Sequence, residues 1–262
     1  MDLAALGGQR LAVALAWGLL GLAVGWVLNV LVTRLPRGGS LLAAPLHCHS
    51  CGKPLSFWDA APLVGFLAQR GRCCYCGANL SWRFPAIEIA TALLYALACL
   101  RYGLGLELAV YSLYLAILVV IFAIDWRHRL ILNVVTYPTA ILCLALAVVT
   151  PGSSLVSSLL GAAAYGGTFV LLYLFAVVIY RRGDALGMGD VKLAIIVGLM
   201  VGLPRAIVAM VLGILLGALA GAAALLAGRS GKEPIPYGTS LSLAAAFAIL
   251  YGDLLVNWYI YS

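Results

Sequence analysis

The sequence predicts an all-α polytopic membrane protein with about eight transmembrane helices. Of its 262 residues, 65% are hydrophobic and only 10% are charged, and the mean hydropathy is +1.09. Soluble domains carry about 25% charged residues, so this composition excludes an ordinary soluble protein. Long apolar runs recur along the whole chain, and basic residues concentrate in alternate loops between them. Together these observations indicate helices that cross a bilayer.

The apolar runs are separated by turn residues such as Pro151 and Gly152. Spans are expected at residues 11–33, 85–100, 107–125, 131–149, 155–180, 191–203, 206–227 and 239–258. The sixth is short and contains glycine, so we expect it to tilt or to lie partly inside the bundle. The first run follows a single basic residue, Arg10, and lacks a small-residue cleavage site, which indicates a retained span.

The distribution of basic residues predicts the orientation. Of the 16 Lys and Arg residues, only Arg10, Arg101 and Arg205 fall in one set of loops. The positive-inside rule then places both termini outside and residues 34–84 in the cytoplasm of a bacterial inner membrane. The predicted domains are a first span (1–33), a cytoplasmic loop domain (34–84) and a transmembrane core (85–262). The net charge of +7 fits membrane topology and anionic lipid, and we expect no nucleic acid partner.

The 34–84 loop contains two CxxC pairs, and each pair is followed by glycine. The candidate ligands are Cys48, Cys51, Cys73 and Cys76. Paired CxxC knuckles at this spacing predict a four-thiolate zinc site, which would be structural because four thiolates leave no open position. Two disulfides, a redox role or uncoordinated thiols are the alternatives, and the reducing cytoplasm disfavours the disulfides. A loop this short needs such a cross-link to fold.

Two aspartates lie at the predicted cytoplasmic ends of spans. Asp125 closes one apolar run, and Asp190 follows Gly187 and Gly189 in a GxGD sequence. Ionisable groups at membrane depth are functional candidates, and two facing carboxyl groups can act as base and acid. Flexible glycines beside the acid would admit an unwound substrate. Each motif alone is ambiguous, since Asp190 is also an ordinary helix N-cap and Asp125 an ordinary span end.

Gly187, Gly189 and Lys192 are expected to support the active site, with Lys192 pairing with a carboxylate or with lipid phosphate. Other polar residues near these motifs have simpler interpretations. Asp184 is expected to pair with neighbouring arginines, and Asp59 to serve in a turn or ion pair. Glu88, a few residues into the second span, is an accessory polar candidate.

Several motifs in order resemble the type IV prepilin peptidases, a GxGD-type family of aspartic membrane proteases. The resemblance covers nearly the whole chain and rests on residues 28–36, 48–51, 70–76, 83–88, 124–131, 187–193 and 235–238. It implies cleavage of prepilin and pseudopilin precursors on the cytoplasmic side, with Asp125 and Asp190 as catalytic residues. It also implies N-methylation of the new terminus with S-adenosylmethionine, because the long form of the family carries the cysteine loop.

Two departures from the family pattern stand in this chain. Leu132 replaces a frequent proline, and residues 59–62 read Asp-Ala-Ala-Pro where Asp-Asn-Ile-Pro is common. The second departure bears on methyl transfer, and the sequence has no glycine-rich fingerprint for S-adenosylmethionine. The simpler alternative is that the 34–84 loop only guides the leader of the precursor or braces the spans.

Two other function classes compete with the peptidase. A transporter or proton-relay protein would use the same aspartates, but it should show deeper acids and repeated halves. A membrane thiol oxidoreductase would use the CxxC pairs, but it should place them on the oxidising side.

Overall fold

The computed structural model describes residues 3–38, 50–53, 63–180, 187–228 and 236–261. These residues are almost entirely helical, and within them no strand forms beyond an isolated bridge between Arg72 and Asn79. The chain divides into two compact units, Met1–Leu108 and Ala109–Ser262, which are described separately.

The first unit is built on a pair of long helices. It contains α1 (Leu3–Arg34), the 3-10 turn η1 (Leu35–Arg37), α2 (Val64–Ala68) and α3 (Arg83–Tyr102). A Cβ atom placed on Gly25 of α1 would lie 2.7 Å from Cα of Glu88 in α3. One placed on Gly21 would lie 2.8 Å from Cα of Ala92. The two backbones therefore meet at glycines, as small residues allow in membrane helix pairs.

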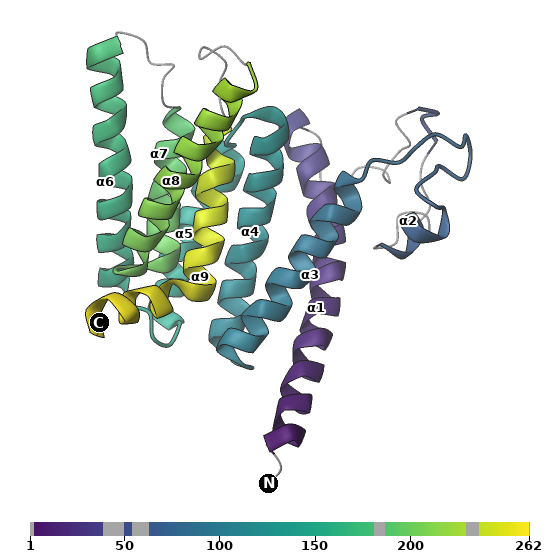
Figure 1. Cartoon of the computed structure of the whole chain (residues 1–262), viewed down its shortest axis with the longest axis horizontal. Coiled ribbons are helices and arrows are strands. Elements are labelled where there is room, and N and C mark those ends of the chain that lie inside the picture. Colours follow the sequence, from purple (N-terminus) through teal and green to yellow (C-terminus); the bar gives the residue numbers. More distant parts are fainter. Residues whose placement is uncertain (1–2, 39–49, 54–62, 181–186, 229–235, 262) are drawn as a thin grey trace. The chain divides into compact units, whose positions relative to one another are not determined.

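The second unit is a bundle around one short helix. Its helices are α4 (Leu106–His128), α5 (Asn133–Val149), α6 (Leu155–Tyr180), α7 (Met188–Val201), α8 (Arg205–Leu226) and α9 (Tyr237–Tyr261), with α4 beginning in the last residues of the first unit. Helix α7 packs against α5, α6, α8 and α9, and most of its side chains are buried. Figure 1 shows α8 and α9 running side by side in this unit.

All eight predicted apolar runs are helices, so the all-helical class is confirmed. In the described part of the chain, six helices are long and apolar enough to cross a membrane. The other two are α5 and α7, with 17 and 14 residues. The expectation that the sixth run lies inside the bundle is confirmed by the burial of α7.

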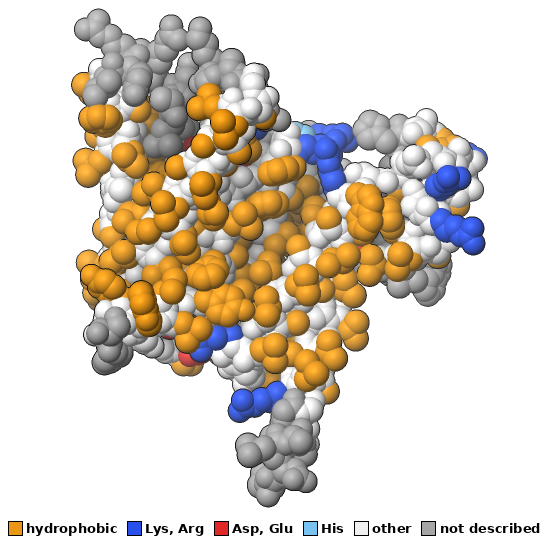
Figure 2. Space-filling model, in the orientation of Figure 1, with side chains coloured by type: hydrophobic (Ala, Val, Ile, Leu, Met, Phe, Trp, Pro, Cys, Tyr) orange, Lys and Arg blue, Asp and Glu red, His pale blue; other side chains and the backbone are white. Residues whose placement is uncertain are grey.

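The outward faces of the helices are apolar. Leu171 and Val178 of α6 and Leu219 of α8 are exposed by 68%, 74% and 66%. Figure 2 shows hydrophobic side chains over the visible surface of these helices. Because the backbone of a helix satisfies its own hydrogen bonds, such a surface suits contact with lipid tails.

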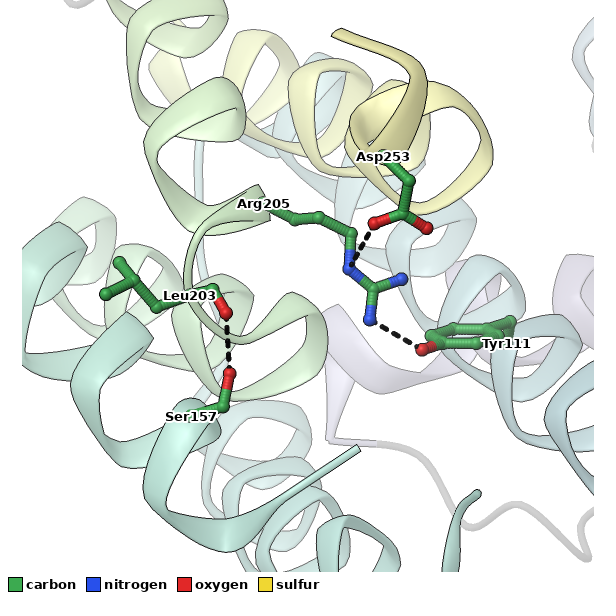
Figure 3. A network of polar contacts seen from close by, with 5 residues as sticks. All are labelled: Tyr111, Ser157, Leu203, Arg205 and Asp253. Atoms are coloured by element: carbon green, nitrogen blue, oxygen red, sulfur yellow. Dashed lines mark hydrogen bonds and ion pairs between the residues drawn. The ribbon is translucent and has the colours of Figure 1, made fainter. Parts of the chain in front are cut away.

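A polar network joins three helices of the second unit at one end (Figure 3). Nη2 of Arg205, at the start of α8, donates a hydrogen bond of 2.9 Å to the hydroxyl of Tyr111 in α4. Nε of Arg205 lies 3.5 Å from Oδ1 of Asp253 in α9. Tyr111 precedes Asp125 by about four helical turns. The network therefore fixes the end of the bundle that is remote from Asp125.

Candidate functional site

Asp125 lies in the last turns of α4, where the helix is about to end. Its side chain is only 4% exposed. Arg129, at a φ of 53°, donates its backbone N–H to the carbonyl oxygen of Asp125 at 2.8 Å. The left-handed residue closes the helix there, as residues after a helix C-terminus commonly do. The apolar run thus carries a carboxyl group into the protein and stops immediately afterwards.

The start of α9 binds the Asp125 carboxyl group. The backbone N–H of Thr239 donates to Oδ2 of Asp125 at 2.8 Å, and the backbone N–H of Gly238 donates to the same carboxyl group. The first N–H groups of a helix have no partner within the helix, and they carry its positive dipole end. These donors stabilise the ionised form of the Asp125 carboxylate.

Asp190 lies in the first turn of α7. Gly187 precedes the helix in an extended conformation, and its carbonyl oxygen accepts the backbone N–H of Asp190 at 3.0 Å. A Cβ atom placed on Gly187 would lie 3.3 Å from Oδ2 of Asp190. Because Gly187 has no side chain, no Cβ atom lies beside the half-buried carboxyl group.

The side chain of Ile131 links the surroundings of the two aspartates. A Cβ atom on Gly189, next to Asp190, would lie 3.0 Å from Cβ of Ile131. One on Gly238, against Asp125, would lie 3.1 Å from Cδ1 of the same isoleucine. The carboxyl groups of Asp125 and Asp190 are also close enough to interact electrostatically. The structure thus brings together two acids that lie far apart in the sequence.

This arrangement suits acid–base chemistry. Two adjacent carboxyl groups favour sharing a single proton. Asp125 accepts backbone N–H groups from Gly238 and Thr239, whereas Asp190 accepts one from Gly187, so the larger number of donors favours Asp125 as the ionised member of the pair. An ionised carboxylate beside a protonated one can activate water and polarise a carbonyl group.

Lys192 lies on the α5 side of α7. Its ammonium group donates a hydrogen bond of 2.8 Å to Oδ1 of Asn133 and lies 5.4 Å from the centroid of the Tyr137 ring. Lys192 therefore ties the start of α7 to the start of α5. In these contacts Lys192 has a structural role, because it attaches the helix that carries Asp190 to α5.

Glu88 is held by hydrogen bonds within the first unit. Glu88 is buried in the first unit, where Oε1 accepts Nδ2 of Asn29 at 3.0 Å and Oε2 accepts the backbone N–H of Leu63 at 2.6 Å. Asn29 also donates to the carbonyl oxygen of Phe84 at 3.0 Å. Glu88 thus joins α1 and α3 to Leu63, the residue immediately before α2. Asp59 and Asp184 lie outside the described residues.

Three of the four predicted zinc ligands lie together. The sulfur atoms of Cys51, Cys73 and Cys76 are all within 4.8 Å of one another, and Cys73 is buried. Gly52 and Gly77 follow the CxxC pairs with φ values of 68° and 70°, which glycine adopts without strain. The thiol set fits a zinc ion of tetrahedral geometry. Cys48 lies outside the described residues.

Several residues of the site carried no predicted role. Gly238 and Thr239 donate backbone N–H groups to Asp125, and such donors cannot be recognised from the pattern of side chains. Ile131 fills the space between two glycines, and Asn29 binds Glu88 across the first unit. The sequence around Pro236, a proline and a glycine before an apolar run, is the feature that could have indicated a helix start near the site.

Comparisons with known proteins cover most of the chain. The family model of the bacterial peptidase A24 N-terminal domain matches residues 19–102, and that of the type IV leader peptidase family matches residues 112–222. No solved structure matches the chain significantly.

Curated relatives match over nearly their full length. A prepilin leader peptidase/N-methyltransferase of Bacillus subtilis is 32% identical over 87% of this chain and 90% of the relative. The protein of the same name from Pseudomonas aeruginosa is 30% identical over 97% and 96%. That from Legionella pneumophila is 28% identical over 93% of each. Because two family models cover most of the chain and relatives at least 30% identical match most of its length, the chain belongs to the type IV leader peptidase family.

Proposed function

We propose that this protein is a membrane aspartic endopeptidase that removes the basic leader from type IV prepilins and pseudopilins and methylates the new N-terminus. The observation that carries the proposal is the pairing of Asp125 and Asp190 at the ends of two apolar helices. The names of the relatives, prepilin leader peptidase/N-methyltransferase, support the same substrate and both activities.

In the proposed mechanism, Asp125 is the ionised base and Asp190 the protonated acid. Asp125 takes a proton from water, and the resulting hydroxide attacks the scissile carbonyl carbon. Asp190 donates its hydrogen bond to the carbonyl oxygen, which stabilises the developing negative charge. The proton held by Asp125 then passes to the amide nitrogen as the C–N bond breaks, which releases the leader as a carboxylic acid and the mature chain as an amine. The glycines at 187 and 189 admit the substrate backbone beside this acid. A precursor helix in the bilayer would present its leader junction to the site.

We place this site on the cytoplasmic side of the bacterial inner membrane. The support is the positive-inside bias, since most basic residues fall in the loops on the side of Asp125 and Asp190. Basic loops also suit contact with anionic lipid headgroups. The multi-pass character itself follows from the six long apolar helices among the described residues.

We propose that Cys48, Cys51, Cys73 and Cys76 hold one structural zinc ion. The clustering of three of these thiols supports it. Coordination would contribute much of the free energy that folds so small a loop. For methyl transfer, the relatives imply S-adenosylmethionine as the donor of the methyl group.

Cleavage of a prepilin precursor by the purified protein in detergent tests the proposal. We expect Asp125→Asn and Asp190→Asn each to abolish cleavage while the protein stays folded. Asp253→Asn, at the remote end of the bundle, is the matched control and should keep cleavage. Near-normal turnover by either aspartate variant would contradict the dyad. Mass spectrometry of the product then tests methylation, since a free amine despite added methyl donor would leave a peptidase alone.

The transporter alternative is not favoured. The family comparisons match peptidases, and the two acids lie at helix ends rather than along a path through the bundle.

A further inference from the structure

The short helix α2 is bound to the first turns of α3. The backbone N–H of Leu63, immediately before α2, donates a hydrogen bond of 2.6 Å to Oε2 of Glu88. Glu88 lies about 7.5 Å along the apolar helix that begins at Arg83. Because the side chains of a helix lean toward its N-terminus, the contact places the start of α2 level with the first turns of α3. Helix α2 therefore begins at the depth where the chain enters the bilayer.

A contact between aromatic rings holds the middle of α2 at the same depth. The ring of Phe66 lies 5.6 Å, between centroids, from the ring of Trp82, the residue directly before α3. Gly71 leaves room for the Phe66 ring, since a Cβ atom placed there would lie 3.1 Å from Cζ of Phe66. Gly71 also donates its backbone N–H to the carbonyl oxygen of Phe66 at 2.9 Å. Phe66 thus attaches α2 to the beginning of α3.

The residues around Phe66 present a mixed apolar and basic surface. Leu67, the next residue of α2, is 63% exposed, and Trp82 is 69% exposed. Arg70 and Arg72 follow α2 and are exposed as well. Leucine and tryptophan beside basic residues are typical of segments that lie in the interface between lipid and water. Tryptophan in particular is enriched at that depth.

The charge of the 34–84 loop indicates which partner this surface fits. Its basic residues are Arg34, Arg37, Lys53, Arg70, Arg72 and Arg83, and Asp59 is its one acid. A zinc ion with four thiolates would carry two negative charges, and the loop would remain positive. Such a loop attracts anionic phospholipid headgroups. The same charge repels the basic leader of the proposed substrate, so the leader fits this surface poorly.

We propose that residues 63–72, together with Trp82, form an interfacial lipid-binding segment. Leu67 and Trp82 lie among the upper parts of the acyl chains, and Arg70 and Arg72 contact anionic phospholipid headgroups. The 34–84 loop is thereby held against the membrane surface rather than projecting into the water. The proposal stands on contacts within the first unit and does not depend on the peptidase activity.

The test measures the depth of position 67 in the full-length protein, reconstituted into vesicles. An environment-sensitive fluorescent amino acid takes the place of Leu67, and the phospholipids carry bromine either near the headgroup or near the end of the acyl chain. We expect blue-shifted emission that the shallow bromines quench most. The same fluorophore in place of Leu171, similarly exposed on α6, is the control and should be quenched most by the deep bromines.

A second comparison tests the headgroup charge. Shallow quenching at position 67 should be stronger in vesicles that contain phosphatidylglycerol than in vesicles of phosphatidylcholine alone. Arg70→Gln combined with Arg72→Gln should remove this difference, whereas Arg10→Gln, near the other end of α1, should keep it. High salt should also shrink the difference in the protein with both arginines, because salt screens exposed charges. The salt series needs no substitution at Arg70 or Arg72 and so reports on charge even if the double variant folds poorly.

Several results would overturn the proposal. Emission typical of water, without quenching, would show that the loop projects from the membrane. Strongest quenching by the deep bromines would place α2 in the hydrocarbon interior instead of the interface. Equal quenching in the two kinds of vesicle would exclude the anionic headgroups. A blue shift that appears only after a prepilin precursor is added would identify the leader as the partner of this surface.

Discussion

The backbone N–H of Thr239 lies 2.8 Å from Oδ2 of Asp125, although 114 positions separate the two residues in the sequence. The contact joins the end of α4 to the beginning of α9. It uses an N–H group that α9 cannot satisfy internally. The carboxyl group of Asp125 therefore depends on a helix terminus rather than on a basic side chain for its closest stabilisation.

Gly238→Ala should slow the enzyme because the new methyl group crowds the Asp125 carboxyl group. Its Cβ would lie 3.0 Å from both Cγ and Oδ2 of Asp125, so the carboxyl group must shift by a few tenths of an ångström. We expect kcat for precursor cleavage to fall about tenfold, because the rate depends steeply on the position of reacting groups. Gly167→Ala in α6, where nothing lies within 4 Å of the added methyl group, is the control and should keep its kcat. Equal activity of the two variants would show that the close contact is unimportant.

Cys73→Ser should abolish the proposed binding of zinc. Cys73 is the buried member of the thiol cluster, and serine is a poor zinc ligand. Metal analysis should find about one zinc per chain in the natural protein and much less in the variant. The neighbouring Cys74 is exposed and stands outside the cluster, so Cys74→Ser should keep the zinc. A natural protein that is folded and active without zinc would contradict the site.

Glu88→Ala should release the segment that leads into α2. The change leaves the buried Asn29 amide and the backbone N–H of Leu63 without their carboxylate acceptor. Leu63 has a φ of 50°, an uncommon conformation for leucine that this hydrogen bond helps to hold. Limited proteolysis between residues 38 and 82 should become faster, by several-fold.

The control for this change is Glu107→Gln, in the first turn of α4. It should leave the proteolysis rate unchanged. A Glu88→Ala protein that resists protease as well as the natural one does would show that the buried carboxylate does not hold this segment.

Gly198→Ala should destabilise the second unit. A Cβ atom there would overlap the carbonyl group of Gly161 and approach Cα of Ala162 to 2.6 Å, so α6 and α7 would have to separate. Overpacking of this kind costs about 1–3 kcal/mol. The thermal midpoint in detergent should fall, and cleavage should weaken because α7 carries Asp190.

Gly167→Ala in α6 is the matched control, since nothing lies within 4 Å of the added methyl group. This second alanine should leave the midpoint unchanged or raise it slightly. Equal thermal midpoints for the two variants would contradict close packing at Gly198.

The sequence by itself determined the helical membrane class. An apolar run long enough to cross a bilayer must satisfy its own backbone hydrogen bonds there, and a helix does so. It also indicated Asp125, Asp190 and the candidate cysteine ligands of zinc, because charged or thiol side chains stand out against such a composition. The glycines of the GxGD motif were likewise visible, since an acid after flexible glycines is a local pattern.

Only the tertiary structure decided how these residues are held. The donors to Asp125 are backbone groups of Gly238 and Thr239, and every residue except proline has such a group, so no side-chain pattern marks them. Two further contacts depend on which helices pack together. The side chain of Ile131 lies between Gly189 and Gly238, and Lys192 donates a hydrogen bond to Asn133. Hydropathy determines which segments can enter the membrane, but close contacts between helix backbones determine which helices pack against one another.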